Sequence, residues 1–302
     1  MNNSGEEIIS CENLVKIYKT NDIEVLALQG LDLTIMEGEL TAIIGNSGSG
    51  KSTFLNMLGG LDRPTAGRLV VCGKDLLKLT ESQLEKYKLE TVGFVWQNNA
   101  RNLIPYLTAL ENIELPMILS KRSQRKDHAL EILELMGMSH RKNNKLHQLS
   151  GGEQQRIAIG IALANNPKLL LADEPTGSVD SRTADKILDI FREINKNLGI
   201  TIVIVTHDRQ LSRKVERVIA IRDGRTSSEF IKMKSYTEEF ANLKGEIGGD
   251  GKRDEQVELA VVDRAGRLQI PKEYLEAIGV LGKGKVRVEL ENDKITIYSP
   301  EN

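Results

Sequence analysis

The pattern of apolar and polar positions switches repeatedly between strand-like and helix-like stretches. Apolar residues alternate over Leu31 to Ile35 and again over Leu40 to Ile44, which predicts two neighbouring strands separated by a short turn. Two further apolar runs, Leu169 to Ala172 and Ile200 to Val205, also have the length of buried strands. These segments predict the strands of one sheet.

Helix-period segments lie between the predicted strands. The pattern is helical after Lys51, from about residue 97 to 150, after Ile157, and near Ala184 to Leu198. Strands that alternate with helices of this length predict an α/β fold with a mostly parallel sheet covered on its faces. The segment from about 97 to 150 predicts a helical subdomain inserted into that core.

The C-terminal part has a different pattern. Glycines and charges dominate Gly245 to Gln256, which is typical of a flexible linker. Beyond it we expect a strand at 257–262, a short helix at 274–278, and a hairpin formed by 286–290 and 295–298. The predicted division is a large domain at 1–233, a linker at 234–255 and a small α+β domain at 256–302. So small a domain has little core, and dimerisation would add to it.

Composition narrows the class of protein. The chain has 302 residues, 41 Lys and Arg against 43 Asp and Glu, and therefore a formal net charge of −2. That balance gives no global basic field for nucleic acid. Two distant cysteines, Cys11 and Cys72, exclude a disulfide framework and favour a reducing compartment. No apolar run has the length of a membrane span, and the polar, acidic N-terminus does not look like a secretory signal.

A phosphate-binding loop is predicted between the strand ending at Ile44 and the following helix. The loop matches G-x-x-x-x-G-K-[ST], in which backbone N–H groups and a helix N-terminus surround phosphate oxygens. Lys51 is expected to reach the β- and γ-phosphates of a nucleotide, and the Ser52 hydroxyl is expected to bind Mg²⁺. The predicted nucleotide-binding residues here are Gly45, Asn46, Ser47, Gly48, Ser49, Gly50, Lys51, Ser52 and Thr53.

Two adjacent carboxylates, Asp173 and Glu174, follow the apolar strand at 169–172. In an open α/β sheet, ligands bind beyond the carboxyl ends of the strands. Asp173 is therefore expected to hold the metal and Glu174 to polarise the attacking water. The alternative is a strand cap that only satisfies backbone N–H groups.

The segment LSGGEQQR at 149–156 is highly specific to one family. Together with the two motifs above, it makes residues 7 to 225 resemble the nucleotide-binding domain of ATP-binding cassette (ABC) transporters. The resemblance implies that Ser150, Gly151 and Gly152, at a helix start, face the γ-phosphate held by the opposite subunit.

The same resemblance assigns roles at four further positions. It implies that Gln97 senses Mg²⁺ and the γ-phosphate, that Asp180 couples the two sites, and that His207 contacts the γ-phosphate. It also implies that Tyr18 stacks on adenine. Because π-stacking tolerates different bases, such a contact would explain broad nucleotide acceptance. Glu174, His207, Lys51 and Gln97 are thus the expected catalytic residues, and Ser52, Gln97 and Asp173 the expected metal ligands.

The segment LTALENIELP at 107–116 resembles a subgroup that includes macrolide exporters, lipoprotein-release ATPases, bacteriocin-resistance pumps and the cell-division ATPase. The resemblance implies an ATPase that uses ATP and Mg²⁺, dimerises around ATP, and powers a separate integral membrane permease from the cytoplasmic face. Export or extraction of a hydrophobic, peptide or lipid substrate is expected. A mechanical signalling ATPase acting on the cell envelope is an alternative, and an ATP-gated, DNA-associated regulator is another.

The segment from Val262 to Glu273, with the strands that follow, resembles the AbrB-like swapped-hairpin family, whose members form intertwined dimers. It implies that the C-terminal domain joins two copies of the chain. Many such domains bind DNA. Residues 254–302, however, carry seven basic and ten acidic groups, and 7 − 10 gives −3. This balance argues against binding to the phosphate backbone.

Overall fold

The computed structural model describes most of the chain. The described residues are 6–19, 23–97, 102–177, 179–208, 214–232, 256–262, 266–270, 272–280, 286–291 and 294–299. The linker expected at 234–255 lies outside them. Within these ranges, the helices are all too short or too polar to cross a bilayer.

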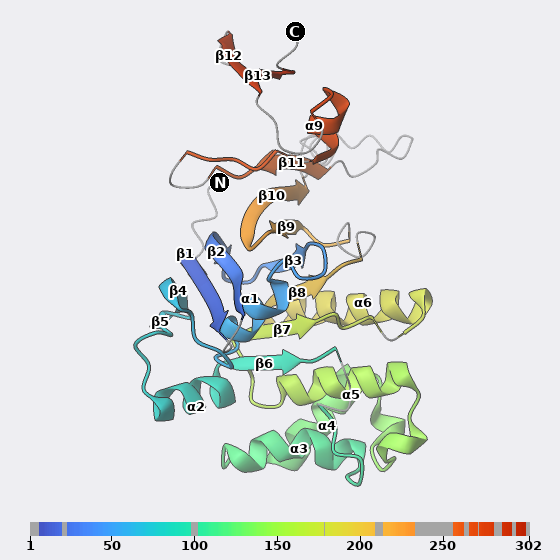
Figure 1. Cartoon of the computed structure of the whole chain (residues 1–302). Helices are drawn as coiled ribbons and strands as arrows, with labels where there is room; N and C mark the ends of the chain where they lie inside the picture. The colour runs from blue at the N-terminus through green and yellow to red at the C-terminus, as the bar shows by residue number, and fades with distance from the viewer. Residues whose placement is uncertain are drawn as a thin grey trace, which may run out of the picture.

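A seven-stranded sheet forms the centre of the molecule, with the strand order β11-β10-β9-β3-β8-β7-β6 (Figure 1). The five strands from β9 to β6 in this order run parallel, whereas β10 and β11 are added antiparallel at one edge. The sequence prediction of a mostly parallel sheet is confirmed. The strands are β3 (Leu40–Ile44), β6 (Val92–Val95), β7 (Leu169–Asp173), β8 (Thr201–Thr206), β9 (Arg217–Arg222), β10 (Arg225–Lys232) and β11 (Gln256–Ala260).

A second, antiparallel sheet has the order β2-β1-β4-β5. Its strands are β1 (Glu7–Lys19), β2 (Glu24–Met36), β4 (Ala66–Val71) and β5 (Lys74–Asp75). The expectation that 31–35 and 40–44 are neighbouring strands was wrong, because β2 pairs with β1 whereas β3 lies between β8 and β9. The turn between β2 and β3 is bound to the seven-stranded sheet, because the Gly38 N–H donates to the Thr201 hydroxyl of β8 at 2.9 Å.

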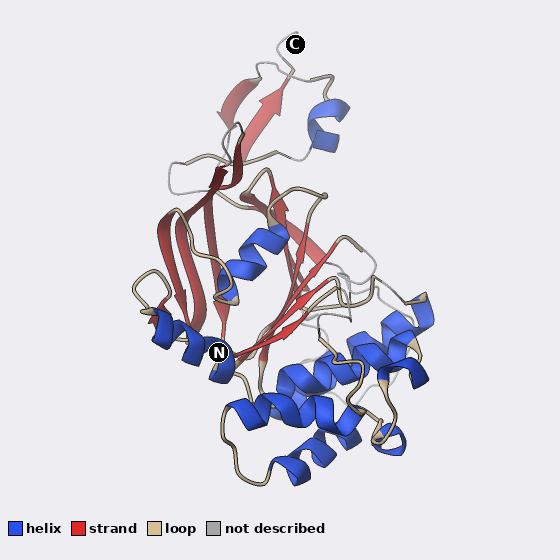
Figure 2. Ribbon diagram, turned by 60° about the horizontal axis from the view of Figure 1, so that its bottom comes forward, coloured by secondary structure: helices blue, strands red, loops and turns tan. Residues whose placement is uncertain are grey.

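One helix lies between the two sheets, and a layer of helices covers the outer face of the large sheet (Figure 2). The helix α1 (Lys51–Leu58) shares an apolar core with β1, β2, β4, β7 and β8, so it lies between the two sheets. A second apolar core lies between the opposite face of the large sheet and several of the other helices. These helices include α3 (Ala109–Leu119), α4 (Arg125–Leu135), α5 (Gly151–Leu163) and α6 (Ser181–Leu198), while α2 (Glu81–Glu90) packs on the first core.

The expected helical subdomain is found, with α3, α4 and two short 3₁₀ turns between residues 109 and 148. Its apolar face is buried at Ala129, Ile132, Leu133 and Met136. Thr108 begins α3 with a capping box in which its hydroxyl accepts from the Glu111 N–H.

The C-terminal elements also match the pattern. They comprise β11, α9 (Lys272–Ala277) and a hairpin of β12 (Arg287–Glu291) with β13 (Lys294–Tyr298). The sequence placed β11 in the separate small domain. In the structure β11 pairs with β10 over five register positions and so extends the large sheet (Figure 1).

Candidate functional site

The phosphate-binding loop connects β3 to α1 in a conformation that requires glycine. Gly50 caps α1 with φ 100°, and a Cβ there would lie 2.5 Å from the Ala27 carbonyl oxygen. A Cβ on Gly45 would lie 2.2 Å from the Ile221 carbonyl oxygen. The loop is therefore closely enclosed by β2 and by the end of β9.

Lys51 folds back over this loop. Its Nζ donates to the carbonyl oxygens of Gly45 at 2.8 Å and Asn46 at 2.9 Å. Burial lowers the pKa of Lys51, and the nearby carboxylates of Glu174 and Asp173 oppose that shift. An ammonium group surrounded by carbonyl oxygens and facing carboxylates is suited to exchange those partners for phosphate oxygens.

Ser52 and Asp173 lie together although they are far apart in the sequence. The Ser52 hydroxyl donates to Asp173 Oδ1 at 3.2 Å, which joins the start of α1 to the end of β7. Both are oxygen ligands of the kind that Mg²⁺ prefers. Among the described residues no group of three or more His, Cys, Asp or Glu side chains is arranged for a metal. A metal held by Ser52 and Asp173 would take its remaining ligands from Gln97, as the sequence predicts, and from phosphate and water.

Glu174 and His207 form a second pair, at the ends of β7 and β8. His207 Nδ1 lies 2.8 Å from Glu174 Oε1. The Glu174 side chain is 13% exposed and that of His207 is 70% exposed, so the imidazole reaches out from a mostly buried carboxylate. Glu174 has φ 46°, uncommon for a residue with a side chain, and its N–H donates to the Val205 carbonyl at 2.9 Å. The backbone thus fixes the carboxylate beside β8.

Gln97 follows β6 and reaches the same edge of the sheet. Its Nε2 lies 3.7 Å from the position that a Cβ on Gly177 would occupy. Gly177 belongs to the turn after Glu174, because its N–H donates to the Glu174 carbonyl at 3.0 Å. The parallel strands β3, β6, β7 and β8 therefore bring Lys51, Gln97, Glu174 and His207 together at the carboxyl ends of the strands. Open α/β sheets bind their ligands at this edge.

The loop fits an anion on further grounds. The Ser49 hydroxyl is buried and has no hydrogen-bond partner among the described residues, whereas buried polar groups in folded proteins are normally paired. The Ser49 carbonyl accepts from the Gly224 N–H at 3.1 Å, so the turn between β9 and β10 supports the loop. With the N-terminus of α1 adding positive potential, Gly48, Ser49 and their neighbours suit a phosphate group.

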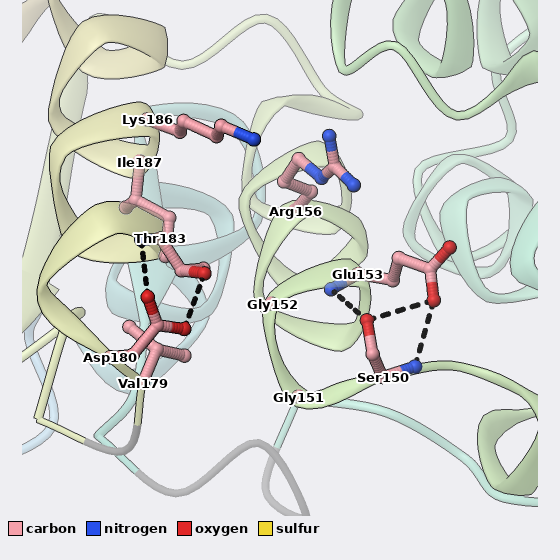
Figure 3. A pocket seen from close by; sticks show the side chains of 10 residues that line it. All are labelled: Ser150, Gly151, Gly152, Glu153, Arg156, Val179, Asp180, Thr183, Lys186 and Ile187. Atoms are coloured by element: carbon pink, nitrogen blue, oxygen red, sulfur yellow. Dashed lines mark hydrogen bonds between the residues drawn. The ribbon is translucent and has the colours of Figure 1, made fainter.

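A separate group of predicted residues lies at the starts of α5 and α6 (Figure 3). Ser150 caps α5, donating to Glu153 Oε2 at 2.9 Å and accepting from the Glu153 N–H at 3.4 Å. Asp180 caps α6 and accepts from the Thr183 N–H at 3.0 Å and from its hydroxyl at 2.7 Å. Ser178, two residues before Asp180, lies outside the described residues.

These two helix starts enclose a hollow of about 310 Å³. Its lining residues are Ser150, Gly151, Gly152, Glu153, Arg156, Val179, Asp180, Thr183, Lys186 and Ile187. A Cβ on Gly152 would lie 2.6 Å from Thr183 Cγ2, so glycine permits the two helices to approach. Within the part of the chain that the structure describes, hydrogen bonds of Ser150 stay in the first turn of its own helix.

Sequence reasoning missed Arg141, which stabilises the capping box of Ser150 and Glu153 at the start of α5. Arg141 Nε donates to Glu153 Oε1 at 2.9 Å. The backbone N–H of Ser150 lowers the pKa of Glu153 to about 2, with the Ser150 hydroxyl and Arg141 adding to it against the effect of burial. The spacing S-x-x-E at 150–153 was a visible capping signal, but no spacing identifies Arg141.

Tyr18 lies on β1 and is 39% exposed. Its phenol donates to Asp62 Oδ2 at 2.6 Å, and Lys16 Nζ is 4.7 Å from the centre of its ring. Thr53, at the start of α1, also hydrogen-bonds the phenol. The residue expected to bind a base is thus connected to the helix that begins at the phosphate loop.

Comparison with known proteins places these motifs in one family. Residues 28–177 match the family model described as ABC transporter. The chain is 43% identical to the ATP-binding cassette MJ0796, in a dimeric post-hydrolysis structure bound to ADP and Pi, with a TM-score of 0.67. That match covers 73% of this chain and 97% of MJ0796. The chain is also 28% identical to cbiO1 from Clostridium perfringens, part of the transporter complex cbiONQ, over 79% of this chain and 96% of cbiO1, with a TM-score of 0.69.

The expected fold class is confirmed by these matches. Identity above 40% over nearly the whole of a solved cassette is sufficient to assign the family. The chain belongs to the ATP-binding cassettes of ABC transporters and is an ATPase that uses ATP with Mg²⁺.

Proposed function

We propose that ATP is hydrolysed at a site built from two copies of this chain. One copy would supply the residues at the sheet edge, which are Lys51, Ser52, Gln97, Asp173, Glu174 and His207. The other would supply Ser150 and Gly152. This proposal is supported by the separation of the two groups within one chain, and by the helix start at Ser150, which offers backbone N–H groups to an anion.

Each residue at the sheet edge has a distinct expected role. Lys51 neutralises the β- and γ-phosphates after leaving its two loop carbonyls. Ser52 and Asp173 would hold Mg²⁺, which supplies charge neutralisation at the phosphate oxygens. Glu174 accepts a proton from the attacking water, while His207, 2.8 Å from Glu174 Oε1, contacts the γ-phosphate and also orients the carboxylate. Gln97 lies beside the turn that follows Glu174 and so can register phosphate and metal together.

The membrane partner is part of the same proposal. As a cassette of a transporter, the chain would act from the cytoplasmic face on a separate integral membrane permease. Residues 107–116, which include the capped start of α3, suggest the exporter and lipoprotein-release subgroup, and hence a hydrophobic, peptide or lipid substrate.

Isolation of the chain with its membrane partner tests this proposal. We expect a permease to co-purify with the wild-type chain and to stimulate phosphate release when both are reconstituted in lipid. Lys51→Ala should retain the permease and lose the stimulation, because Lys51 is required for phosphate and not for docking. A chain that hydrolyses ATP but retains no membrane protein would contradict the transporter assignment.

We also propose that the C-terminal hairpin, by its AbrB-like resemblance, joins two copies of the chain. Register places Val288, Leu290, Ile295 and Ile297 on one face of the β12–β13 hairpin. Val288, Leu290 and Ile295 are 59%, 75% and 66% exposed. An isolated two-stranded hairpin is marginal in water, so an apolar face of this kind favours pairing with a second hairpin.

Charge placed on that face should separate the copies. We expect the wild-type chain to be a dimer without nucleotide in light scattering, and Leu290→Lys to be a monomer. Thr296→Lys is the matched control, because Thr296 lies on the opposite face of the same hairpin and should leave the dimer intact. A wild-type monomer would reject this role for the hairpin.

A further inference from the structure

A charged cluster lies beneath Tyr18, formed by residues that no motif identifies. Lys16 Nζ donates to Asp62 Oδ1 at 2.5 Å and to the Arg63 carbonyl at 2.8 Å. The second Asp62 oxygen accepts from the Tyr18 phenol at 2.6 Å. The Asp62 carboxylate therefore holds both the lysine and the tyrosine.

The cluster fixes the position of the ring as well as that of the hydroxyl. Lys16 and Tyr18 are two residues apart on β1, so their side chains leave the same face of the strand. Lys16 Nζ lies over the ring, 4.7 Å from its centre, in cation–π geometry. One face of the ring is thus covered by the ammonium group, while Tyr18 as a whole stays 39% exposed.

The loop that carries Asp62 follows α1, whose first turn belongs to the phosphate site. Its connection to β1 continues at Thr65, whose N–H donates to the Val15 carbonyl at 2.8 Å and whose hydroxyl accepts from the Ile17 N–H at 3.0 Å. This loop is continuous with α1 at one end and is hydrogen-bonded to β1 at the other, so it connects the helix of the phosphate site to the strand that carries Tyr18. The Tyr18 ring is thereby fixed relative to the phosphate loop.

The pKa shifts of Asp62 and Tyr18 favour the ionised carboxylate and the protonated phenol that their hydrogen bond requires. Burial by itself would raise the pKa of Asp62, but hydrogen bonds from Lys16, Tyr18 and the Arg63 N–H lower it overall. Burial raises the pKa of Tyr18, and the Asp62 hydrogen bond adds to this effect, so the phenol remains a donor. The Lys16 side chain is only 11% exposed, and a buried ammonium requires such partners.

We propose that Asp62 and Lys16 are positioning residues for the base of the nucleotide. They hold the Tyr18 ring with one face covered, so that the purine of ATP or ADP stacks on the other. This inference rests on the proposed ATP site and on the adenine-stacking role that the family resemblance implies for Tyr18. A ring that is already fixed loses little conformational entropy when the base binds, which strengthens stacking without a new contact.

A comparison of ADP with inorganic pyrophosphate isolates the contribution of the base. Titration calorimetry on the full chain measures both affinities without hydrolysis. In Asp62→Asn, we expect ADP to bind about five- to thirtyfold more weakly and pyrophosphate to change by less than about twofold. The KM for ATP should rise by a similar factor with kcat nearly unchanged, because the reacting groups are untouched.

Further variants separate positioning from stability. Tyr18→Phe keeps the ring and loses the bond to Asp62, so it should weaken ADP and leave pyrophosphate unchanged even if Asp62→Asn folds poorly. Glu81→Gln is the matched control, because it breaks the 2.7 Å ion pair of Arg63 in the same loop without reaching Tyr18. It should change neither affinity.

Two outcomes would overturn the inference. Equal weakening of ADP and pyrophosphate by Asp62→Asn would show that the cluster only supports the phosphate loop, and no weakening of either would show that the ring needs no support. Tyr18→Ala distinguishes these from failure of the stacking assignment. If Tyr18→Ala weakens ADP but Asp62→Asn does not, only the positioning role is wrong, whereas an unchanged Tyr18→Ala rejects the base contact itself.

Discussion

Replacement of Glu174 by glutamine is the most direct test of the chemistry. The side chain is mostly buried, and its Oε1 is engaged by His207 at 2.8 Å. In the described part of the chain its Oε2 has no hydrogen-bond partner, which leaves that oxygen to accept a proton from water. The amide of Glu174→Gln has the same shape but cannot take that proton. The backbone, fixed by the bond from the Glu174 N–H to Val205, should not move.

Loss of a general base costs about 10² to 10⁴ in rate, which corresponds to roughly 2.7 to 5.4 kcal/mol of barrier. We therefore expect phosphate release to slow by that factor while ADP affinity is retained. An ATP-bound dimer should accumulate in size-exclusion chromatography. Glu193→Gln, the same change at an exposed position of α6, should behave as wild type. Turnover of Glu174→Gln within about threefold of wild type would refute the assignment of Glu174 as the base.

Three further changes address the second group of residues and the core. Ser150→Arg should abolish hydrolysis but preserve ADP affinity. A mixed dimer of a Ser150→Arg chain and a Lys51→Ala chain has both lesions in one composite site and leaves the other site whole, so phosphate release from the mixture should show retained activity. Glu153 has a pKa of about 2, below its ordinary 4.5, so its ionised form stabilises the fold above pH 4.5 and loses this effect as pH falls toward 2. Urea unfolding at several acidic pH values should show a shallower loss for Glu153→Gln. Both polar atoms of the Gln155 amide are buried and have no hydrogen-bond partner within the described ranges, so Gln155→Met should raise the thermal midpoint by a few degrees.

The sequence predicted the parts of the site that depend on local geometry. A glycine loop between a strand and a helix has few conformations, so Lys51 and Ser52 could be placed relative to phosphate from their spacing alone. Asp173 and Glu174 could be placed at the sheet edge because a short apolar run ends before them. Their expected roles remain predictions, while the strands and helices that position them are confirmed.

Other features depend on contacts between distant segments and carry no local signal. Asp62 meets Tyr18 across 44 positions of sequence, and its neighbourhood reads as an ordinary turn. The alternation at 31–35 predicted a strand correctly, but it does not specify the partner strand, and β2 joined a sheet that the pattern had not indicated. Pairing of β11 with β10 was hidden for the same reason.

In the proposed function, the residues at the phosphate loop and those at the starts of α5 and α6 differ in how far their hydrogen bonds would change when nucleotide binds. Ser150 and Asp180 are fixed by hydrogen bonds within the first turns of α5 and α6, so their helix starts are organised in the single chain. Lys51, in contrast, donates to the carbonyls of Gly45 and Asn46, and in the proposed function it would exchange these partners for phosphate oxygens. On that proposal, the rearrangement would be concentrated at the phosphate loop. The Gly224 N–H, in the turn between β9 and β10, donates to the Ser49 carbonyl of that loop, and β10 pairs in turn with β11, so successive backbone hydrogen bonds connect the phosphate loop to the C-terminal segment.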